Sequence, residues 1–459
     1  MNHRPLEPGD APAEPGTTDD EQAGATVNAN DRGFRRALEA FAHRNYAIYW
    51  IGGLLSNIAR WMLDVTVPYV IYQLTSSAGL VGVAAFARLV PGVVVAPIAG
   101  SIADRFHRQA VLIVTHLGLA AVTFGYWIAW TADVATPTVI IGLSVLSGIV
   151  VGLNLPAWHA FVPELVPRDH LFGAITLNSA QINVAKAVGP GIAGVILATA
   201  GTAWAFLVTA LFFASVTVVI GLIRVPRRPK PVLGQRMLAQ FMDVLRHARG
   251  HPTLAVSGLV MLTIAVLGMP VFQLTAVFAT DVFRVGPTGF GILAGALGLG
   301  GAATAPVLAG WMRGISRRRL IGASMLWYGV MLIAFAHSTL FPIGVVAMAM
   351  VGGAFIAVNS TISTTVQLVV DDDIRGRIVA LYLTGFALAY PLGSLVQGWI
   401  AEQIGAPATV TGAGALMVCA AIWFLANATV RASMDRSAPV AGAAAPEALT
   451  YDDQGIVQG

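Results

Sequence analysis

Twelve runs of predominantly apolar residues follow one another along this chain of 459 residues. An apolar segment of about 20 residues is long enough to cross a bilayer as a helix, and a helix satisfies its own backbone hydrogen bonds there. We therefore predict an all-α membrane protein with twelve transmembrane helices. The predicted helices lie near residues 46–74, 79–101, 110–131, 137–162, 171–199, 203–223, 253–281, 287–312, 319–338, 341–369, 376–402 and 408–430.

The composition excludes a water-soluble globular protein. Hydrophobic residues make up 56% of the chain and charged residues only 11%, and the mean hydropathy is +0.73, so too few charges remain to cover a core of this size. The pI of about 9.4 does not indicate nucleic-acid binding, because the basic residues occur in short groups between apolar runs. The single Cys419 excludes an intrachain disulfide and a cysteine metal site, and we expect its side chain to be buried.

The basic residues lie almost entirely on one side of the predicted membrane. Of the 27 Lys and Arg residues, Arg60, Arg88 and Lys186 fall inside the apolar runs and Arg284 falls in a loop on the far side, which leaves 23 on the other face. Because Lys and Arg are concentrated in cytoplasmic loops, we predict a multi-pass protein of the inner or plasma membrane with both termini in the cytosol.

Polar segments divide the twelve runs into two sets of six. We predict a disordered cytosolic tail over 1–45, a six-helix bundle over 46–224, a cytosolic linker over 225–252, a second six-helix bundle over 253–430 and a disordered tail over 431–459. In the linker, apolar residues recur at helical spacing from Met237 to Leu245. This pattern fits an amphipathic helix on the membrane surface and fits a plain linker equally well.

The two halves resemble each other in sequence. The stretch "VAPIAGSIADRFHR" is matched by "TAPVLAGWMRGISRRR", Asn154 in "GLNLP" is matched by Asn359 in "IAVNS", and Pro190 is matched by Pro391. Parallel repeats of six helices around a central substrate site are a transporter architecture. The repeat therefore favours a transporter.

Several of these stretches resemble a known family. "GSIADRFHR" is similar to the loop between the second and third helices of major facilitator superfamily transporters, although His107 stands where the family has Gly. "SNIARWM", "GLNLPAWHAFVPELVPRDHL", "LNSAQINVAKAVGPGIAG" and "DDDIRGRIVALY" resemble the transmembrane secretion effectors, a subgroup that includes enterobactin exporters. The resemblance implies a twelve-helix secondary transporter that exports small molecules by alternating access.

Charged loops at the cytosolic ends of the helices are candidates for a gate. Gly100 allows a close helix approach, Asp104 can accept hydrogen bonds at a helix start, and the arginines beside it can pair with carboxylates. Across the interface between the bundles, Arg375 and Arg377 are expected to meet Asp104 or Glu164. A purely topogenic role of these loops is the alternative. The predicted gate comprises Gly100, Asp104, Arg105, Arg108, Glu164, Arg375 and Arg377.

Charged residues at membrane depth are the strongest candidates for a transport site. Asp64 is the only carboxylate in the interior of the runs, and we predict it to be a proton-coupling site, with a structural ion pair to Arg60 or Arg88 as the alternative. The positive surplus predicts an anionic or amphiphilic substrate, such as a siderophore, drug or secondary metabolite. The candidate cavity residues are Asn57, Arg60, Arg88, Asn178, Gln181, Asn183, Lys186 and Asn359, with helix packing as the alternative role for the amides.

Other motifs narrow the function further. "VGPGIAG" resembles the Gly-Pro motif in the fifth helix of family antiporters and singles out Gly189, Pro190 and Gly194. No P-loop, zinc-binding or nucleophile motif occurs, so we predict no enzyme activity, no cofactor and no metal. The expected partners are a small molecule, protons and the bilayer, and the expected state is a monomer. An uptake transporter of the same fold, or a membrane sensor that transports nothing, remains the alternative.

Overall fold

The computed structural model describes residues 38–224, 245–246, 248, 250–310, 315–370, 372–428 and 430. These residues are almost entirely helical, with no strand among them. The long helices are α2 (Arg44–Thr75), α3 (Ala78–Arg105), α4 (Arg108–Thr131), α5 (Pro137–Phe161), α6 (Leu171–Thr199), α7 (Thr202–Gly221), α11 (Gly286–Gly310), α12 (Arg317–His337), α13 (Phe341–Val369), α14 (Asp372–Ile404) and α15 (Ala406–Ala426). The prediction of an all-α, twelve-helix membrane fold is confirmed.

The seventh membrane segment is broken, although the sequence predicts one continuous run there. It consists of α9 (Pro252–Thr263), a π turn η4 (Ile264–Gly268), α10 (Val271–Val277) and a second π turn η5 (Phe278–Val282). The break falls beside Pro270, which has no backbone N–H to donate. Gln397 of α14 compensates, because its amide donates to the carbonyl oxygens of Val266 and Leu267 at 2.7 and 3.1 Å.

Eleven of the described helical segments are long and apolar enough to cross a membrane. The twelfth, α2, is long enough but carries Arg60 and Asp64 in its middle. Charges at this depth must be kept away from lipid, and α2 packs against α3, α6, α7 and α10.

The prediction of a buried Cys419 is wrong, since its side chain is exposed on α15.

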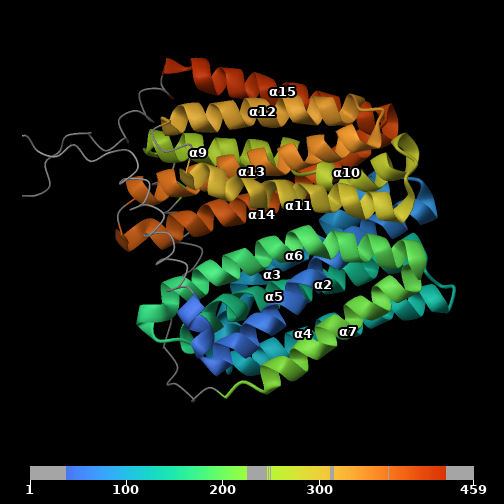
Figure 1. Ribbon diagram of the computed structural model, residues 1–459, viewed down its shortest axis with the longest axis vertical. Coiled ribbons are helices and arrows are strands. Elements are labelled where there is room, and N and C mark those ends of the chain that lie inside the picture. The colour runs from blue at the N-terminus through green and yellow to red at the C-terminus, as the bar shows by residue number, and fades with distance from the viewer. Residues whose placement is uncertain are drawn as a thin grey trace, which may run out of the picture.

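The helices form two bundles that lie one above the other in Figure 1, α2 to α7 and α9 to α15. In the first bundle α3 packs on α5, α4 on α7 and α2 on α6; in the second, α11 packs on α13, α12 on α15 and the broken seventh segment on α14. The same pairing therefore recurs in both halves, as parallel repeats require. Glycines allow the closest of these approaches, since a Cβ at Gly152 would collide with Gly92 and one at Gly352 with Leu297.

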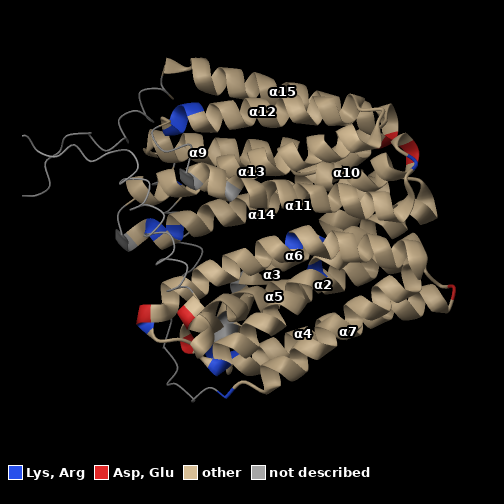
Figure 2. Cartoon of the chain, viewed as in Figure 1, with Lys and Arg blue, Asp and Glu red and all other residues tan. Residues whose placement is uncertain are grey.

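The charged side chains mark one end of the molecule. We define the basic face by the helix ends at Arg105–Arg108, Arg168–His170, Arg317–Arg319 and Arg375–Arg377, and the far face by the opposite helix ends. Figure 2 shows Lys and Arg gathered mainly at the basic face, with a few blue positions at mid-depth.

Described residues of the linker begin at 245, so the predicted amphipathic helix lies largely outside the described residues.

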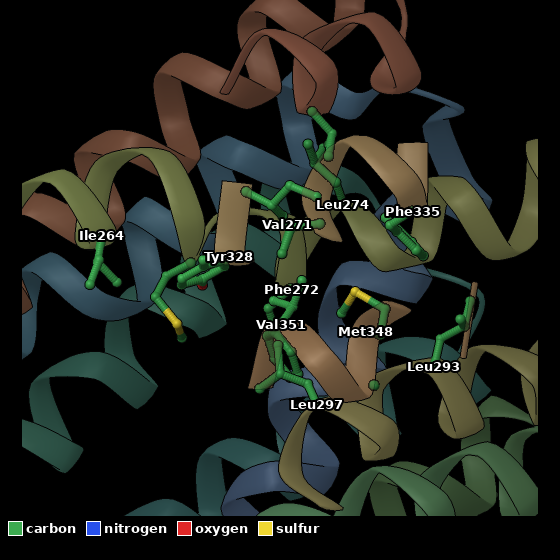
Figure 3. Close-up of a cluster of buried hydrophobic side chains, with 14 of the residues drawn as sticks. Ile264, Val271, Phe272, Leu274, Leu293, Leu297, Tyr328, Phe335, Met348 and Val351 are labelled. Carbon is green, nitrogen blue, oxygen red and sulfur yellow. The ribbon is translucent and has the colours of Figure 1, made fainter. Parts of the chain in front are cut away.

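A large apolar core fills the second bundle. Figure 3 shows side chains of several helices meeting there, including Phe272, Leu297 and Tyr328. Burying such side chains also fixes the positions of the neighbouring polar groups, because well-packed interiors move little. This core forms one wall of the site described next.

Candidate functional site

A cavity of about 230 Å³ lies between the two bundles at mid-depth. The first bundle contributes its charged lining and the second contributes apolar side chains with two uncharged polar ones. The lining residues are Arg60, Trp61, Asp64, Arg88, Leu89, Val151, Lys186, Met269, Phe272, Gln273, Leu297 and Tyr390. Four predicted site residues, Arg60, Asp64, Arg88 and Lys186, therefore meet in one cavity.

Asp64 forms an ion pair with Arg88. The Asp64 Oδ1 lies 2.5 Å from the Arg88 Nη1, and the two side chains are only 19% and 9% exposed. The pair joins α2 to α3. Of the two arginines considered as its partner, Arg60 and Arg88, the structure pairs Asp64 with Arg88. Arg60 makes no ion pair among the described residues.

Lys186 is held by aromatic rings rather than by a carboxylate. Its Nζ lies 5.5 Å from the ring centroid of Trp61 on α2 and 5.0 Å from that of Phe355 on α13. Cation–π contacts of this kind stabilise a desolvated ammonium group. With three cations and one carboxylate, the lining residues carry a net charge of +2.

The second bundle presents a polar pair to this charge. The amide nitrogen of Gln273 donates to the hydroxyl of Tyr390 at 2.8 Å. The Gln273 Oε1 is buried and has no hydrogen-bond partner, which leaves an acceptor in the cavity wall. Sequence reasoning missed Gln273 and Tyr390; the available signal was an amide three residues after Pro270 in an otherwise apolar run.

The predicted amide residues lie elsewhere. Asn57 donates to Gln181, and Gln181 donates to the Trp50 carbonyl, so both join α2 to α6. Asn178 lies beside Tyr49, and Asn183 bonds to Ser179 of its own helix. None of these, nor Asn359, is among the described lining residues of the cavity. Asn57 and Gln181 thus join two helices in this structure, and a cavity role for the amides stays a prediction.

The motif on α6 packs two helix pairs together. A Cβ at Gly189 would lie 2.7 Å from the Cβ of Trp61 on α2, and one at Gly194 would lie 2.7 Å from the Cα of Gly291 on α11. Pro190 lies between them, with its carbonyl against Gly291. The motif therefore closes the contact between the bundles on the far side of the cavity.

Contacts between the bundles are concentrated toward the far face. There α6 packs on α11 over residues 186–194 and 287–298, and α3 packs on α14 over residues 78–82 and 394–402. Toward the basic face the ribbons of α6 and α14 diverge (Figure 1). The described contacts thus separate the cavity from the far face.

At the basic face, Glu164 pairs with Arg108 of its own bundle at 2.6 Å. The predicted contact of Arg375 and Arg377 with Asp104 or Glu164 across the bundles stays a prediction. Arg375 bonds to the Val370 carbonyl, and Arg377 and Arg105 are exposed. Gly100 lies in α3, and the side chain of Asp104 lies outside the described part of the chain.

Solved structures share this architecture. A bacterial homolog of the human lysosomal transporter Spinster, in an inward-facing conformation, matches with a TM-score of 0.68 at 16% identity and covers 86% of this chain and 98% of its own. A D-xylose-proton symporter matches with a TM-score of 0.66 at 15% identity, covering 83% and 96%. The chain therefore shares the twelve-helix fold of these proteins, with its cavity between the two six-helix bundles.

The family follows from the sequence comparisons. The model of the transmembrane secretion effector family matches residues 36–457, and this chain belongs to that family. It is 24% identical over 394 residues to the staphyloferrin A transporter of Staphylococcus aureus, covering 85% of this chain and 98% of that protein. It is 28% identical over 369 residues to the multidrug efflux pump Tap of Mycolicibacterium fortuitum (78% and 89%) and 25% identical over 388 residues to macrolide efflux protein A of Streptococcus pyogenes (81% and 93%).

Proposed function

We propose that this transporter exports a small anionic amphiphile from the cell by alternating access. The observation that carries the proposal is the cavity, whose lining has a net charge of +2 beside the apolar side chains of Trp61, Phe272 and Leu297. An uncompensated positive charge at membrane depth is costly, and a bound anion would offset it. The apolar side chains would hold the rest of an amphiphilic cargo.

The relatives support export of small molecules. Two of them are efflux proteins by name, a multidrug pump and a macrolide efflux protein, and a third is a transporter named for staphyloferrin A. The alignments cover most of both chains, but at 24–28% identity the relatives can differ from this chain in cargo. We therefore take the direction of transport from the family and the charge of the cargo from the cavity.

We place the basic face and both termini in the cytosol, following the bias of Lys and Arg toward that side. The structure then corresponds to an inward-facing state, in which cargo enters from the cytosol. In the opposite state the bundles would close at the basic face, and there Arg375 and Arg377 would meet Asp104 or Glu164. A protein tag at either end should report the cytosolic side; tags on opposite sides of the membrane would overturn this orientation.

Asp64 is our candidate for proton coupling, because it is the one carboxylate among the described lining residues. Protonation would remove the charge that pairs with Arg88 and would loosen the contact between α2 and α3. The transporter would act as a monomer, with the cavity formed by the two bundles of a single chain.

Dye transport by purified protein in liposomes tests the charge preference. We expect the amphiphilic anion anilinonaphthalene sulfonate to be transported and to outcompete the cation ethidium. Lys186→Gln should lower anion transport by about tenfold or more, because a charge at contact distance in a partly buried site contributes several kcal/mol. Lys186→Arg keeps the charge and the cation–π contacts and is the matched control.

Equal transport of both dyes, or equal loss in the Gln and Arg variants, would contradict an anionic cargo. A Lys186→Gln protein that still transports ethidium would show that the variant folds. Transport only from the far face to the basic face would instead support the alternative of an uptake transporter.

A further inference from the structure

Two carboxylates of the second bundle reach the first bundle at the far face. The hydroxyl of Tyr72, near the end of α2, donates to the Oδ2 of Asp281 in the π turn η5. The backbone N–H of Gly79, in the first turn of α3, donates to the Oε2 of Glu402 near the end of α14 at 3.1 Å. We call these four residues the far-face latch.

Both bonds are of the kind that a negative charge strengthens. The first N–H groups of a helix have no partner within the helix, and the helix dipole favours an anion beside them. The Ser77 side chain caps Leu80 of α3, and Glu402 satisfies Gly79. A hydrogen bond to an ionised carboxylate is about twice as strong as one between neutral groups, so protonation would weaken both bonds.

The latch lies at the end of the tightest contact between the bundles. Next to the latch along α3 and α14, a Cβ at Gly82 would lie 2.6 Å from the Ser394 carbonyl, and one at Gly398 would lie 2.7 Å from the Ala78 carbonyl. This backbone contact must separate before the cavity can open to the far face. The latch bonds break in the same movement, since each one joins the two bundles.

We propose that Asp281 and Glu402 hold the far face closed as ionised carboxylates, and that protonation of both from that side favours its opening. This inference rests on the proposed function only for the identity of the far face as the outside of the cell. It adds a second point of proton coupling, distinct from Asp64 in the cavity. Protons arriving from outside would then promote the state that releases cargo there.

Access and surroundings fit this role. Both carboxylates are exposed at the far face, whereas Tyr72 is 5% exposed. Asp281 faces the Tyr72 hydroxyl on α2, and Glu402 faces the backbone N–H of Gly79 on α3. Both carboxylates lie close enough to Tyr72 to act on it electrostatically. Arg284 follows η5 three residues after Asp281 and is exposed. Because protonation would weaken both latch bonds, the proposal predicts that the far face opens more readily when the pH on that side falls.

Thiol labelling of the cavity tests the proposal without any cargo. In a Cys419→Ser background, Leu89→Cys places one thiol in the cavity lining. The full chain is reconstituted in vesicles, and a membrane-impermeant maleimide is added at the far face. We expect slow labelling with the far face at pH 7.5 and at least tenfold faster labelling with the far face at pH 5, each rate being divided by that of a free thiol measured at the same pH.

The latch variants should remove this pH response. Asp281→Asn with Glu402→Gln should label fast at both pH values, and Tyr72→Phe, which removes only the hydroxyl, should shift labelling part of the way. Asp281→Glu should restore the response in part. Asp133→Asn is the matched control, because Asp133 is an exposed carboxylate at the same end in the loop before α5, and it should behave like the parent.

Slow labelling of the double variant at both pH values, or an unchanged pH response in it, would overturn the proposal. Labelling from the basic face, which should stay fast in the parent, shows that each variant is folded. Because the readout is access to the cavity, a cargo that proved not to be an anion would leave this result unaffected.

Discussion

Among single residues, the four charged groups of the cavity show how membrane depth restricts a side chain. A charge in an apolar run has to reach a polar interior or a partner, and for Arg60, Asp64, Arg88 and Lys186 the structure provides a common cavity. Asp64 and Arg88 also offset each other's charge, whereas Arg60 and Lys186 do not have a carboxylate partner among the described residues. Asp64 and Arg88 therefore brace two helices, whereas Arg60 and Lys186 are the residues that we propose to bind the cargo.

Removing one member of the brace should destabilise the protein. Asp64→Asn leaves the guanidinium of Arg88 buried beside a neutral amide, and breaking a buried pair in this way costs about 3–5 kcal/mol. We expect a clearly lower thermal unfolding temperature in detergent for Asp64→Asn and for Arg88→Gln alone. The double variant should recover most of the loss, since no unpaired charge remains.

Transport by the same variants separates the two roles of Asp64. If Asp64 couples protons, the double variant is stable but its dye export no longer responds to a pH gradient. Full recovery of gradient-driven export in the double variant would reduce Asp64 to a structural ion pair.

Residue type and depth were enough to predict which charges share the cavity, but they left the partner of Asp64 open between Arg60 and Arg88. Arg60 is one helical turn from Asp64 in the sequence, yet the partner is Arg88, because the packing of α3 on α2 decides which guanidinium reaches the carboxylate. The amides were harder to place, since Asn57 and Gln181 find partners on a neighbouring helix and need no cavity. Gln273 was missed because no charge marks it.

For the helices themselves, close packing rather than charge sets the geometry. The helix ends could be predicted within a few residues because each apolar run is bounded by polar groups. The π turns η4 and η5 could not, because they depend on a local change of hydrogen bonding that leaves composition unchanged. The second of them carries Asp281, and so decides where the far-face latch lies.

A change at the α6–α11 crossing should therefore affect the whole cycle. Gly194→Ala adds a Cβ 2.7 Å from the Cα of Gly291, and the backbone has no flexible side chain that could yield. We expect the bundles to separate at the far face, with transport reduced about tenfold or more and faster labelling of a cavity thiol from that face. The quantities to measure are dye transport and the labelling rate.

Gly191→Ala is the control for this prediction on the same helix. A Cβ at Gly191 would meet nothing within 4 Å, and alanine in place of glycine stabilises a helix by roughly 0.5–1 kcal/mol. Transport should be unchanged and the unfolding temperature equal or higher. An equal loss of transport in both variants would show that α6 tolerates no alanine, and that the crossing with α11 is not the cause.

In the whole molecule, the charge of the cavity is divided unevenly between the two bundles. The described lining residues of the first bundle carry all the charge of the cavity, whereas the second bundle contributes Gln273 and Tyr390 as its polar groups. Under the proposed function, a bound monoanion would remain associated with the first bundle while the second moves around it. Rocking of one bundle against the other around a fixed site is how such repeats alternate access.

The electrical consequence of this cycle can be measured. A monoanion that leaves the cell and a proton that enters move charge in the same direction, so an inside-negative potential should drive both. Each elementary charge contributes about 2.3 kcal/mol per 100 mV. We expect export of anilinonaphthalene sulfonate from liposomes to accelerate when a potassium diffusion potential, negative on the basic-face side, is imposed with valinomycin, and to slow when it is reversed. Liposomes without protein give the passive dye flux to subtract. An export rate that does not depend on the potential would mean that the anion leaves together with a proton. Asp64 would then be protonated while the cargo is bound, and not while the empty transporter returns.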